Sequence, residues 1–177
     1  GCKYFFINNI SHFEFFYNKK VALFAGQYLY MINSHSAELL SKNGIKAFAT
    51  SWEDDLFNIK DLSKNLKNNL IVYLFGFPEV VISKMKFVKE VENKNIKSGI
   101  DEFRVISNNN ENIIVPKFPI NLIGFKNRLI SSGIKSFGID LSHIEPNINY
   151  ITQILKAFNS NAYINSINKF NFERNLK

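Results

Sequence analysis

Apolar residues along the chain follow two spacings in turn, and this alternation predicts a mixed α/β fold. Short apolar runs that end at Gly, Asn or Ser are typical of buried strands, whereas apolar residues three or four positions apart are typical of amphipathic helices. The predicted strands cover residues 4–7, 28–32, 45–50, 70–75, 103–106, 113–115 and 136–141. The predicted helices cover residues 37–43, 55–66, 122–132 and 149–158.

Local signals support some of these boundaries and leave other stretches weak. Ser36 is the predicted N-cap of the helix at 37–43, and Gly44 is its predicted C-terminal stop. The alternation of apolar and polar residues over 10–16 predicts another strand, with one exposed face. Over residues 88–100 the pattern weakens and the charge rises, which predicts an irregular connection.

The order of the predicted elements favours one architecture. Parallel strands need crossover connections, so strands that alternate with helices indicate βα units and a parallel sheet. A complete (β/α)₈ barrel needs at least about 200 residues, whereas the chain has 177. We therefore expect a single domain over residues 1–177, a partial (β/α) TIM-type barrel with parallel strands and a β-hairpin inserted at about residues 101–117.

The positive net charge does not by itself predict a nucleic-acid partner. The chain has 22 Lys and Arg against 15 Asp and Glu, a net charge of +7, but only 3 of the 22 are Arg. Arg is the side chain whose planar fork grips phosphates and guanine edges. The Lys residues are scattered among acidic ones, which is typical of a solvated surface. We therefore expect no nucleic-acid partner.

Features that the sequence lacks narrow the class further. No apolar run approaches the 18 or so residues that a membrane-spanning helix needs, and we expect a soluble, cytoplasmic protein. Cys2 is the single cysteine, which excludes an intrachain disulfide and any site built from cysteines of this chain alone. The sequence has neither a His-x-x-x-His spacing nor a glycine-rich phosphate loop. We expect no metal site and no cofactor.

Candidate chemistry follows from position, because functional residues of parallel α/β folds sit at the carboxyl ends of strands. The residues that this rule selects are Asn33, Ser34, His35, Ser51, Glu53, Asp54, Asp55, Gly76, Glu79, Asp140, Ser142 and His143. Glu53 and Asp140 can act as general acid and base if their strands are near neighbours. The structural alternative for one of these loops is that Ser51, Asp54 and Asp55 cap and charge a helix N-terminus.

The three histidines divide in a similar way. His12 lies in the predicted exposed strand, where a solvent-facing side chain is the simplest interpretation. His35 and His143 both follow predicted strands. Each of these two is either a catalytic base or a loop and capping residue.

Nine short stretches of the chain, taken in order, together form a pattern. They are Tyr30-Met31-Ile32-Asn33 with Ala37-Glu38-Leu39-Leu40 and Gly44-Ile45, Ala49-Thr50-Ser51-Trp52-Glu53, Leu74-Phe75-Gly76-Phe77-Pro78-Glu79, Phe118-Pro119-Ile120-Asn121-Leu122, Ser132-Gly133-Ile134, Phe137-Gly138-Ile139-Asp140-Leu141-Ser142, and Phe170-Asn171-Phe172-Glu173-Arg174-Asn175-Leu176. In this order they resemble the peptidase U32 family of collagenase-like proteins. The resemblance covers the chain from about Leu29 to its end. It implies the C-terminal part of a (β/α) barrel, with the N-terminal half absent from this chain.

The chain also departs from the central signature of that family, which has a Glu, a His and two cysteines. Those positions hold, in order, Ile71, Phe75, Glu79 and Lys86. Relatives that bind iron–sulfur clusters do so through cysteines, so the resemblance implies no cluster here. The positions that do match the family's pattern are Asn33, Ser51, Glu53 and Gly76.

The resemblance and the strand-end rule together predict a U32-peptidase-like protein that cleaves protein or peptide substrates of the collagen-like type. The expected catalytic residues are Ser51, Glu53 and Asp140, and the expected binding residues are Asn33, His35, Gly76, Ser142 and His143. The expected partners are the substrate and either a separate N-terminal half or a second copy of the chain. One alternative is a non-catalytic partner-binding module that has lost the family's signature, and a less favoured one is a component of RNA modification.

Overall fold

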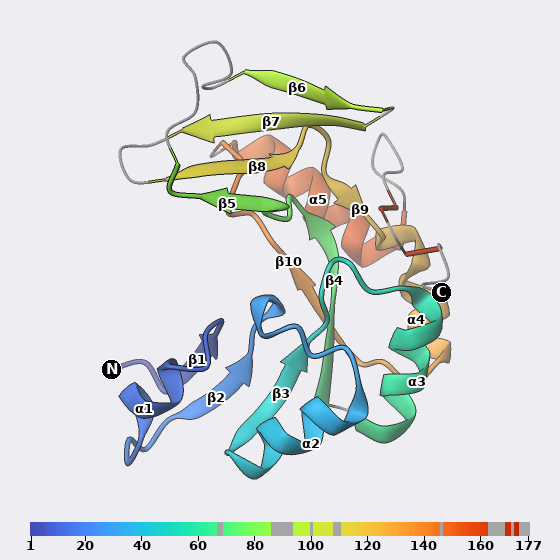
Figure 1. The fold of residues 1–177 in the computed structure, drawn as a ribbon. Helices are drawn as coiled ribbons and strands as arrows, with labels where there is room; N and C mark the ends of the chain where they lie inside the picture. The colour runs from blue at the N-terminus through green and yellow to red at the C-terminus, as the bar shows by residue number, and fades with distance from the viewer. Residues whose placement is uncertain are drawn as a thin grey trace. The chain divides into compact units, whose positions relative to one another are not determined.

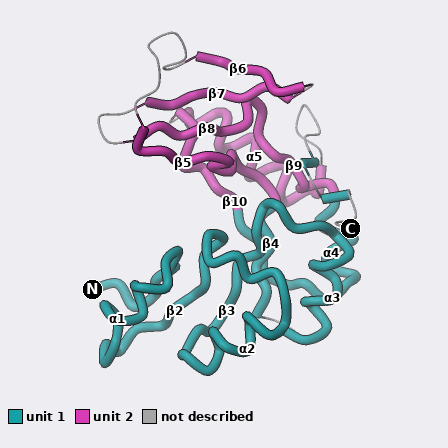
Figure 2. The backbone as a smooth tube through the Cα atoms, in the orientation of Figure 1, with its two compact units in different colours: residues 1–73, 125–138, 169–177 teal, residues 74–124, 139–168 magenta. Residues whose placement is uncertain are grey.

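The computed structural model describes residues 1–66, 69–85, 94–99, 101–107, 111–145, 147–162, 169–170 and 172–173. It has a mixed α/β fold with a parallel-stranded sheet and helices (Figure 1). The chain separates into two compact units (Figure 2). Unit 1 comprises residues 1–73, 125–138 and 169–177, and unit 2 comprises residues 74–124 and 139–168. Whether the 177 residues form one domain stays a prediction.

Unit 1 is built on parallel strands that the chain adds one after another. They are β1 (Tyr4–Ile7), β2 (Ala22–Ala25), β3 (Ile45–Ala49) and the first part of β4 (Leu70–Gly76). Each strand pairs in parallel with the next. The connections contain α1 (His12–Phe16), α2 (Ser34–Lys42) and α3 (Leu56–Leu66). This is the βα arrangement that the sequence predicts.

The third helix shows how apolar spacing produces the core of unit 1. Leu56, Ile59 and Leu62 recur at three-residue intervals on α3, and all three are buried. Burying one such side chain stabilises the fold by about 1.5–3 kcal/mol. At the far end of the helix, the Ser63 hydroxyl donates a 2.9 Å hydrogen bond to the carbonyl of Ser132. That bond ties α3 to the end of α4 (Lys126–Ser131) within the same unit.

The predicted strand at residues 28–32 is wrong. The segment instead contains the 3₁₀ turn η1 (Gln27–Leu29), and Tyr30 has a left-handed backbone with φ of 47° that no strand accommodates. The strand lies earlier, at β2, whose four residues pair with both β1 and β3. Two-sided pairing outweighs the strand propensity of an aromatic-rich run, because it satisfies more backbone groups.

The predicted strand over 10–16 is also wrong, because His12–Phe16 forms the short helix α1. The Asn9 carboxamide oxygen accepts hydrogen bonds from both the backbone N–H and the hydroxyl of Ser11, which turns the chain before the helix. Phe16 then contacts Phe5 of β1, with 4.7 Å between ring centroids. His12 is exposed on this helix rather than on a strand.

Unit 2 contains an antiparallel sheet of four strands in the order β5-β8-β7-β6. Their bounds are β5 (Val81–Ser83), β6 (Asn95–Ser98), β7 (Asp101–Ser107) and β8 (Asn112–Pro116). The antiparallel pairing of β7 with β8 confirms the predicted hairpin. Its predicted turn, residues 108–110, lies outside the described residues. Part of the predicted irregular connection is wrong, because β6 is a strand paired with β7.

The remaining elements of unit 2 surround the last residues of β4. Strand β9 (Ile120–Asn121) pairs antiparallel with Phe75 and Gly76, and α5 (Ile148–Ser160) begins at an N-cap, Asn147. The larger sheet has the order β1-β2-β3-β4-β10, where β10 is Ser136–Ile139. The boundary between the units runs through β4 and β10.

One predicted helix begins later than expected. Residues 122–132 were expected to be helical throughout, but the segment opens with the 3₁₀ turn η3 (Ile123–Phe125) before α4. Asn121 explains the delay, because its side chain accepts a hydrogen bond from the N–H of Ile123. Gly133 ends α4 as predicted, with φ of 91°, a conformation that favours glycine.

Candidate functional site

The carboxyl ends of two strands lie next to each other in unit 2. The N–H of Asp140, directly after β10, donates a 2.8 Å hydrogen bond to the carbonyl of Phe75, near the end of β4. The chain leaves β4 through Gly76 and reaches Glu79 three residues later, and it reaches His143 three residues after Asp140. Two turns that the sequence selected separately are therefore neighbours.

Glu79 and His143 form a pair at these strand ends. His143 Nε2 lies 2.8 Å from Glu79 Oε1, and the two side chains are 14% and 21% exposed. When the Glu79 carboxylate is ionised it can only accept a hydrogen bond, and Nε2 is then the donor. In the neutral imidazole the lone pair is then on Nδ1. This arrangement can take up a proton at Nδ1 while the carboxylate stabilises the resulting imidazolium.

Arg104 on β7 holds the backbone of the same turn. Its Nη2 donates a 2.9 Å hydrogen bond to the carbonyl of His143, and its guanidinium carbon lies 5.5 Å from the ring centroid of Phe77. Phe77 belongs to a buried cluster with Ile113 and Val115. Through Arg104, the antiparallel sheet thus supplies a hydrogen bond to the backbone of the turn that carries His143.

Asp140 and Ser142 shape the turn that precedes His143. Asp140 Oδ1 accepts hydrogen bonds from the N–H of Ser142 at 2.9 Å and from its hydroxyl at 2.5 Å. This is an Asx turn, a local use of a carboxylate that sets backbone geometry. Ser142 is exposed. These contacts set the geometry of the turn, and the expected roles of Asp140 in catalysis and of Ser142 in binding stay predictions.

The loop after β3, in unit 1, uses its polar residues differently. The Ser51 hydroxyl accepts a hydrogen bond from the N–H of Glu53, and Asp55 Oδ1 accepts one from the N–H of Asn58. Asp55 thereby satisfies an otherwise unpaired amide at the start of α3. The helix-capping interpretation of Asp55 is confirmed. Glu53 is exposed.

Asp54 is a buried carboxylate of this loop, with 3% of its surface exposed, as is its neighbour Asp55. Its Oδ1 accepts hydrogen bonds from the N–H of Asp55 at 2.9 Å and from the side-chain amide of Asn58 at 2.8 Å. The same amide reaches the carbonyl of Ile32. Burial raises the pKa of Asp54 to about 6, although these hydrogen bonds oppose the rise. Through Asn58, Asp54 therefore connects the loop after β3 to the segment at Ile32, and burying its ionised carboxylate costs free energy.

The other predicted binding residues of unit 1 lie near α2. Asn33 is the N-cap, and its Oδ1 accepts a 2.9 Å hydrogen bond from the N–H of Ser36. Ser36 was the predicted N-cap, and that prediction is wrong by three residues because the Asn33 side chain reaches the free amide first. His35 lies on the first turn of α2 and is exposed.

Two further predictions have separate outcomes. Gly76, an expected binding residue, is buried at the end of β4 and pairs with Ile120 of β9. The expected acid–base pair of Glu53 and Asp140 takes one residue from each unit and stays a prediction. Within the described ranges there is no cluster of three or more His, Cys, Asp or Glu side chains that can hold a metal ion.

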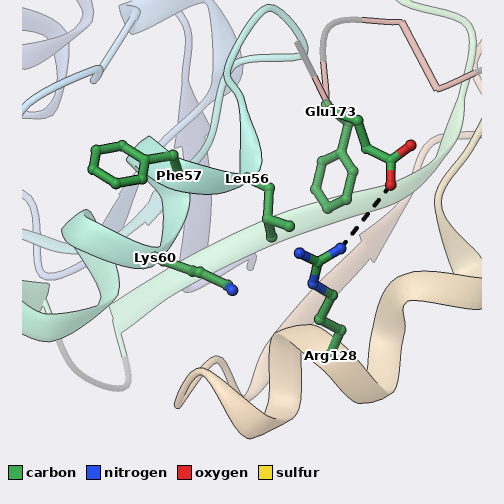
Figure 3. Close-up of a pocket in the computed structure, with 6 residues that line it drawn as sticks. Leu56, Phe57, Lys60, Arg128 and Glu173 are labelled. Atoms are coloured by element: carbon green, nitrogen blue, oxygen red, sulfur yellow. Dashed lines mark ion pairs between the residues drawn. The ribbon is translucent and has the colours of Figure 1, made fainter. Parts of the chain in front are cut away.

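A pocket of about 460 Å³ opens on unit 1 (Figure 3). It is lined by Leu56, Phe57, Lys60, Arg128, Phe172 and Glu173. The Arg128 guanidinium lies 4.0 Å from the Glu173 carboxylate, and both side chains are about half exposed. An ion pair of that length and exposure contributes about 0–1 kcal/mol. Another anion can therefore replace Glu173 as the partner of Arg128 at little cost in free energy.

The sequence rule found Glu79 and His143 but not the groups that support them. Arg104 lies in the middle of a hairpin strand, far from any predicted parallel-strand end, and no pattern in the sequence marks it. The pocket residues come from two helices and a distant segment, so only the tertiary structure brings them together.

Comparisons of the chain with protein-family models, with curated proteins and with solved structures find no match in any of the three. None of the helices in the described part of the chain has the length and apolar character needed to cross a membrane.

Proposed function

We propose that the chain is a hydrolase of peptide bonds of the peptidase U32 type, with Glu79 and His143 as its acid–base pair. The observation that carries the proposal is the 2.8 Å contact between these side chains at two adjoining strand ends. Carboxylate–imidazole pairs at that edge of a parallel α/β fold are suited to general acid–base work. The fixed turn around Asp140 and the Arg104 contact support the same geometry.

In this proposal His143 activates a water molecule. Nδ1 accepts a proton from the water as its oxygen attacks the carbonyl carbon of the scissile peptide bond, and Glu79 stabilises the imidazolium that forms. The C–N bond then breaks, and the same proton passes from Nδ1 to the leaving amine. One water is consumed, one carboxyl and one amine are produced, and the pair returns to its starting state. General acid–base catalysis of this kind contributes about 10²–10⁴-fold in rate.

A partial (β/α) barrel is the architecture that we propose for the complete assembly. Strands β1 to β4 follow one another across the sheet in chain order, as the strands of a (β/α) barrel do. Strand β1 lies at the end of that order, and no strand among the described residues pairs with its outer edge, which can therefore accept another strand. Either a separate N-terminal half or a second copy of the chain is the partner that we propose for this edge.

A second candidate function is that of a non-catalytic, partner-binding module. Two positions of the family's central signature hold Ile71 and Phe75 instead of acid and imidazole groups, and Phe75 is completely buried. A chain that has lost those groups can retain binding to a protein without cleaving it.

The deciding experiment measures the release of labelled peptides from gelatin and casein by the purified chain. We expect His143→Asn and Glu79→Gln each to lower cleavage by at least about 100-fold. The matched controls are His12→Asn and Glu145→Gln, which change an exposed histidine and an exposed glutamate, and we expect them to retain full activity. Thermal melting of each variant separates loss of activity from loss of folding.

A third arm of the same experiment tests the prediction made from sequence. Glu53→Ala abolishes cleavage if the site is centred on Glu53, in which case the Glu79–His143 proposal fails. Equal cleavage by the wild type, His143→Asn and Glu79→Gln also contradicts it. No cleavage by any variant, alone or with a supplied N-terminal half, favours the binding module.

A further inference from the structure

Two buried apolar residues, Leu56 and Phe172, form the floor of the pocket on unit 1. Leu56 and Phe172 are 8% and 2% exposed. The N–H of Leu56 donates a 2.9 Å hydrogen bond to the carbonyl of Phe172, and Phe172 packs against Phe125 with 5.0 Å between ring centroids. These contacts fix the segment at Phe172 to the start of α3. The floor is therefore a preformed surface for an apolar group.

The walls of the pocket carry an excess of positive charge. Lys60 lies one helical turn after Leu56 on α3, and Arg128 projects from α4. Figure 3 shows their charged ends reaching into the same space from two different helices. Among the described residues the Lys60 ammonium has no ion-pair partner.

Among the described residues that line the pocket, Glu173 is the single acidic one, and its carboxylate already has cationic partners. Its Oε2 pairs with Lys169, while its Oε1 is 4.0 Å from Arg128. The lining thus offers two cations for one carboxylate that has a second partner. Phe57 adds an aromatic ring that borders the pocket and is 76% exposed. Two cations beside apolar and aromatic surface are complementary to an organic anion.

We propose that this pocket binds a small organic anion, with its carboxylate or phosphate between Lys60 and Arg128 and its apolar body on Leu56 and Phe172. The proposal is independent of the Glu79–His143 site. It assigns unit 1 a recognition role for a charged small molecule. The anion takes over Arg128 from Glu173, which keeps its pairing with Lys169.

The test uses three probes that share a phenyl group and differ in charge: 3-phenylpropionate, phenyl phosphate and the neutral 3-phenylpropanamide. Dissociation constants come from titrations followed by amide chemical shifts of the ¹⁵N-labelled full chain. We expect the two anions to bind and to shift the amides of α3 and α4. We expect the amide to bind at least about five-fold more weakly. The tighter of the two anions identifies the ligand as a carboxylate or a phosphate.

Variants give effects of opposite sign. Lys60→Gln and Arg128→Gln are expected to weaken anion binding about five-fold, whereas Glu173→Gln is expected to strengthen it about two-fold, because it removes the competing carboxylate. The matched control is Lys46→Gln, which removes an exposed lysine on β3. Equal binding of the amide and the anions, or an equal loss in Lys46→Gln, overturns the proposal. If Arg128→Gln fails to fold, the Glu173→Gln result and the probe comparison still decide it.

Discussion

The loop after β3 in unit 1 and the turns after β4 and β10 in unit 2 use the same residue types for different purposes. In the first loop, the carboxylates of Asp54 and Asp55 accept hydrogen bonds from backbone amides and from the side chain of Asn58. In unit 2, the carboxylate of Glu79 is hydrogen-bonded to the imidazole of His143. Both places are strand ends where the sequence rule expects chemistry.

The difference shows that position alone does not make a carboxylate functional. A carboxylate whose oxygens accept hydrogen bonds from backbone amides holds the chain in place. A carboxylate that accepts from an imidazole leaves the second ring nitrogen for another molecule. The partner of the carboxylate therefore separates a structural strand end from a candidate catalytic one.

The largest effect that sharpens this comparison is expected at Asp54. Its pKa of about 6 lies above its ordinary value of 3.8. Between pH 3.8 and about pH 6, Asp54 is therefore largely protonated in the folded protein and largely ionised in the unfolded chain. The free energy of unfolding therefore falls as the pH rises through this window, by about 3 kcal/mol in total. Asp54→Asn removes this titration. Chemical denaturation from pH 4 to pH 7 is expected to show the advantage of the wild type over the variant shrinking by roughly 2–2.5 kcal/mol, the part of the total that falls within this range.

The control for this experiment is Asp61→Asn on α3, the helix that follows Asp54. Asp61 is an exposed carboxylate that pairs with Lys64 at 3.2 Å, so its substitution removes one charge without changing a buried group. If the stability difference for Asp61→Asn varies with pH as much as that for Asp54→Asn, the burial of Asp54 is not the cause. A difference for Asp54→Asn that stays constant with pH contradicts the structural role given to that carboxylate.

The next largest effect is expected in unit 2, at Arg104. Arg104→Met keeps much of the apolar length beside Phe77 but removes the hydrogen bond to the carbonyl of His143. A hydrogen bond from a charged donor contributes about 1.5–3 kcal/mol, so we expect the free energy of unfolding to fall by about 2 kcal/mol. Because the turn then loses its anchor, any cleavage is expected to fall while its pH profile keeps the same shape. Arg128→Met, at an exposed arginine of unit 1, is the matched control and is expected to change stability by under about 0.5 kcal/mol.

Local sequence signals were sufficient to predict the elements whose structure depends on residues close together in the chain. The buried face of α3, the end of α4 at Gly133 and the β7–β8 hairpin all follow from apolar spacing, a left-handed glycine and strand alternation. The strand at 28–32 failed because pairing partners far away in sequence decide which apolar run enters the sheet. Ala22–Ala25 is less aromatic than residues 28–32, yet it pairs on both sides.

The sequence predicted where the residues of the candidate site lie, but not which of them contact one another. The strand-end rule selected Glu79 and His143 because each follows an apolar run. Their pairing depends on β10 lying beside β4, which the order of elements along the chain does not state. The role of Arg104 could not be predicted from the sequence, for a further reason. It arrives from the antiparallel sheet, so its contact with the turn is a property of tertiary packing alone.

The smallest of the expected effects returns to the loop after β3, where it tests the structural half of the comparison directly. Asp55→Ala removes the acceptor for the N–H of Asn58 at the start of α3, at 2.8 Å. Loss of such a cap costs about 1 kcal/mol, which urea denaturation resolves, while Asp55→Asn is expected to retain most of the stability because an amide oxygen also accepts. Any cleavage by the chain is expected to be unchanged in both variants. A loss of cleavage in a well-folded Asp55→Asn protein means that this carboxylate also does chemistry, and the partner of a carboxylate no longer separates the two strand ends.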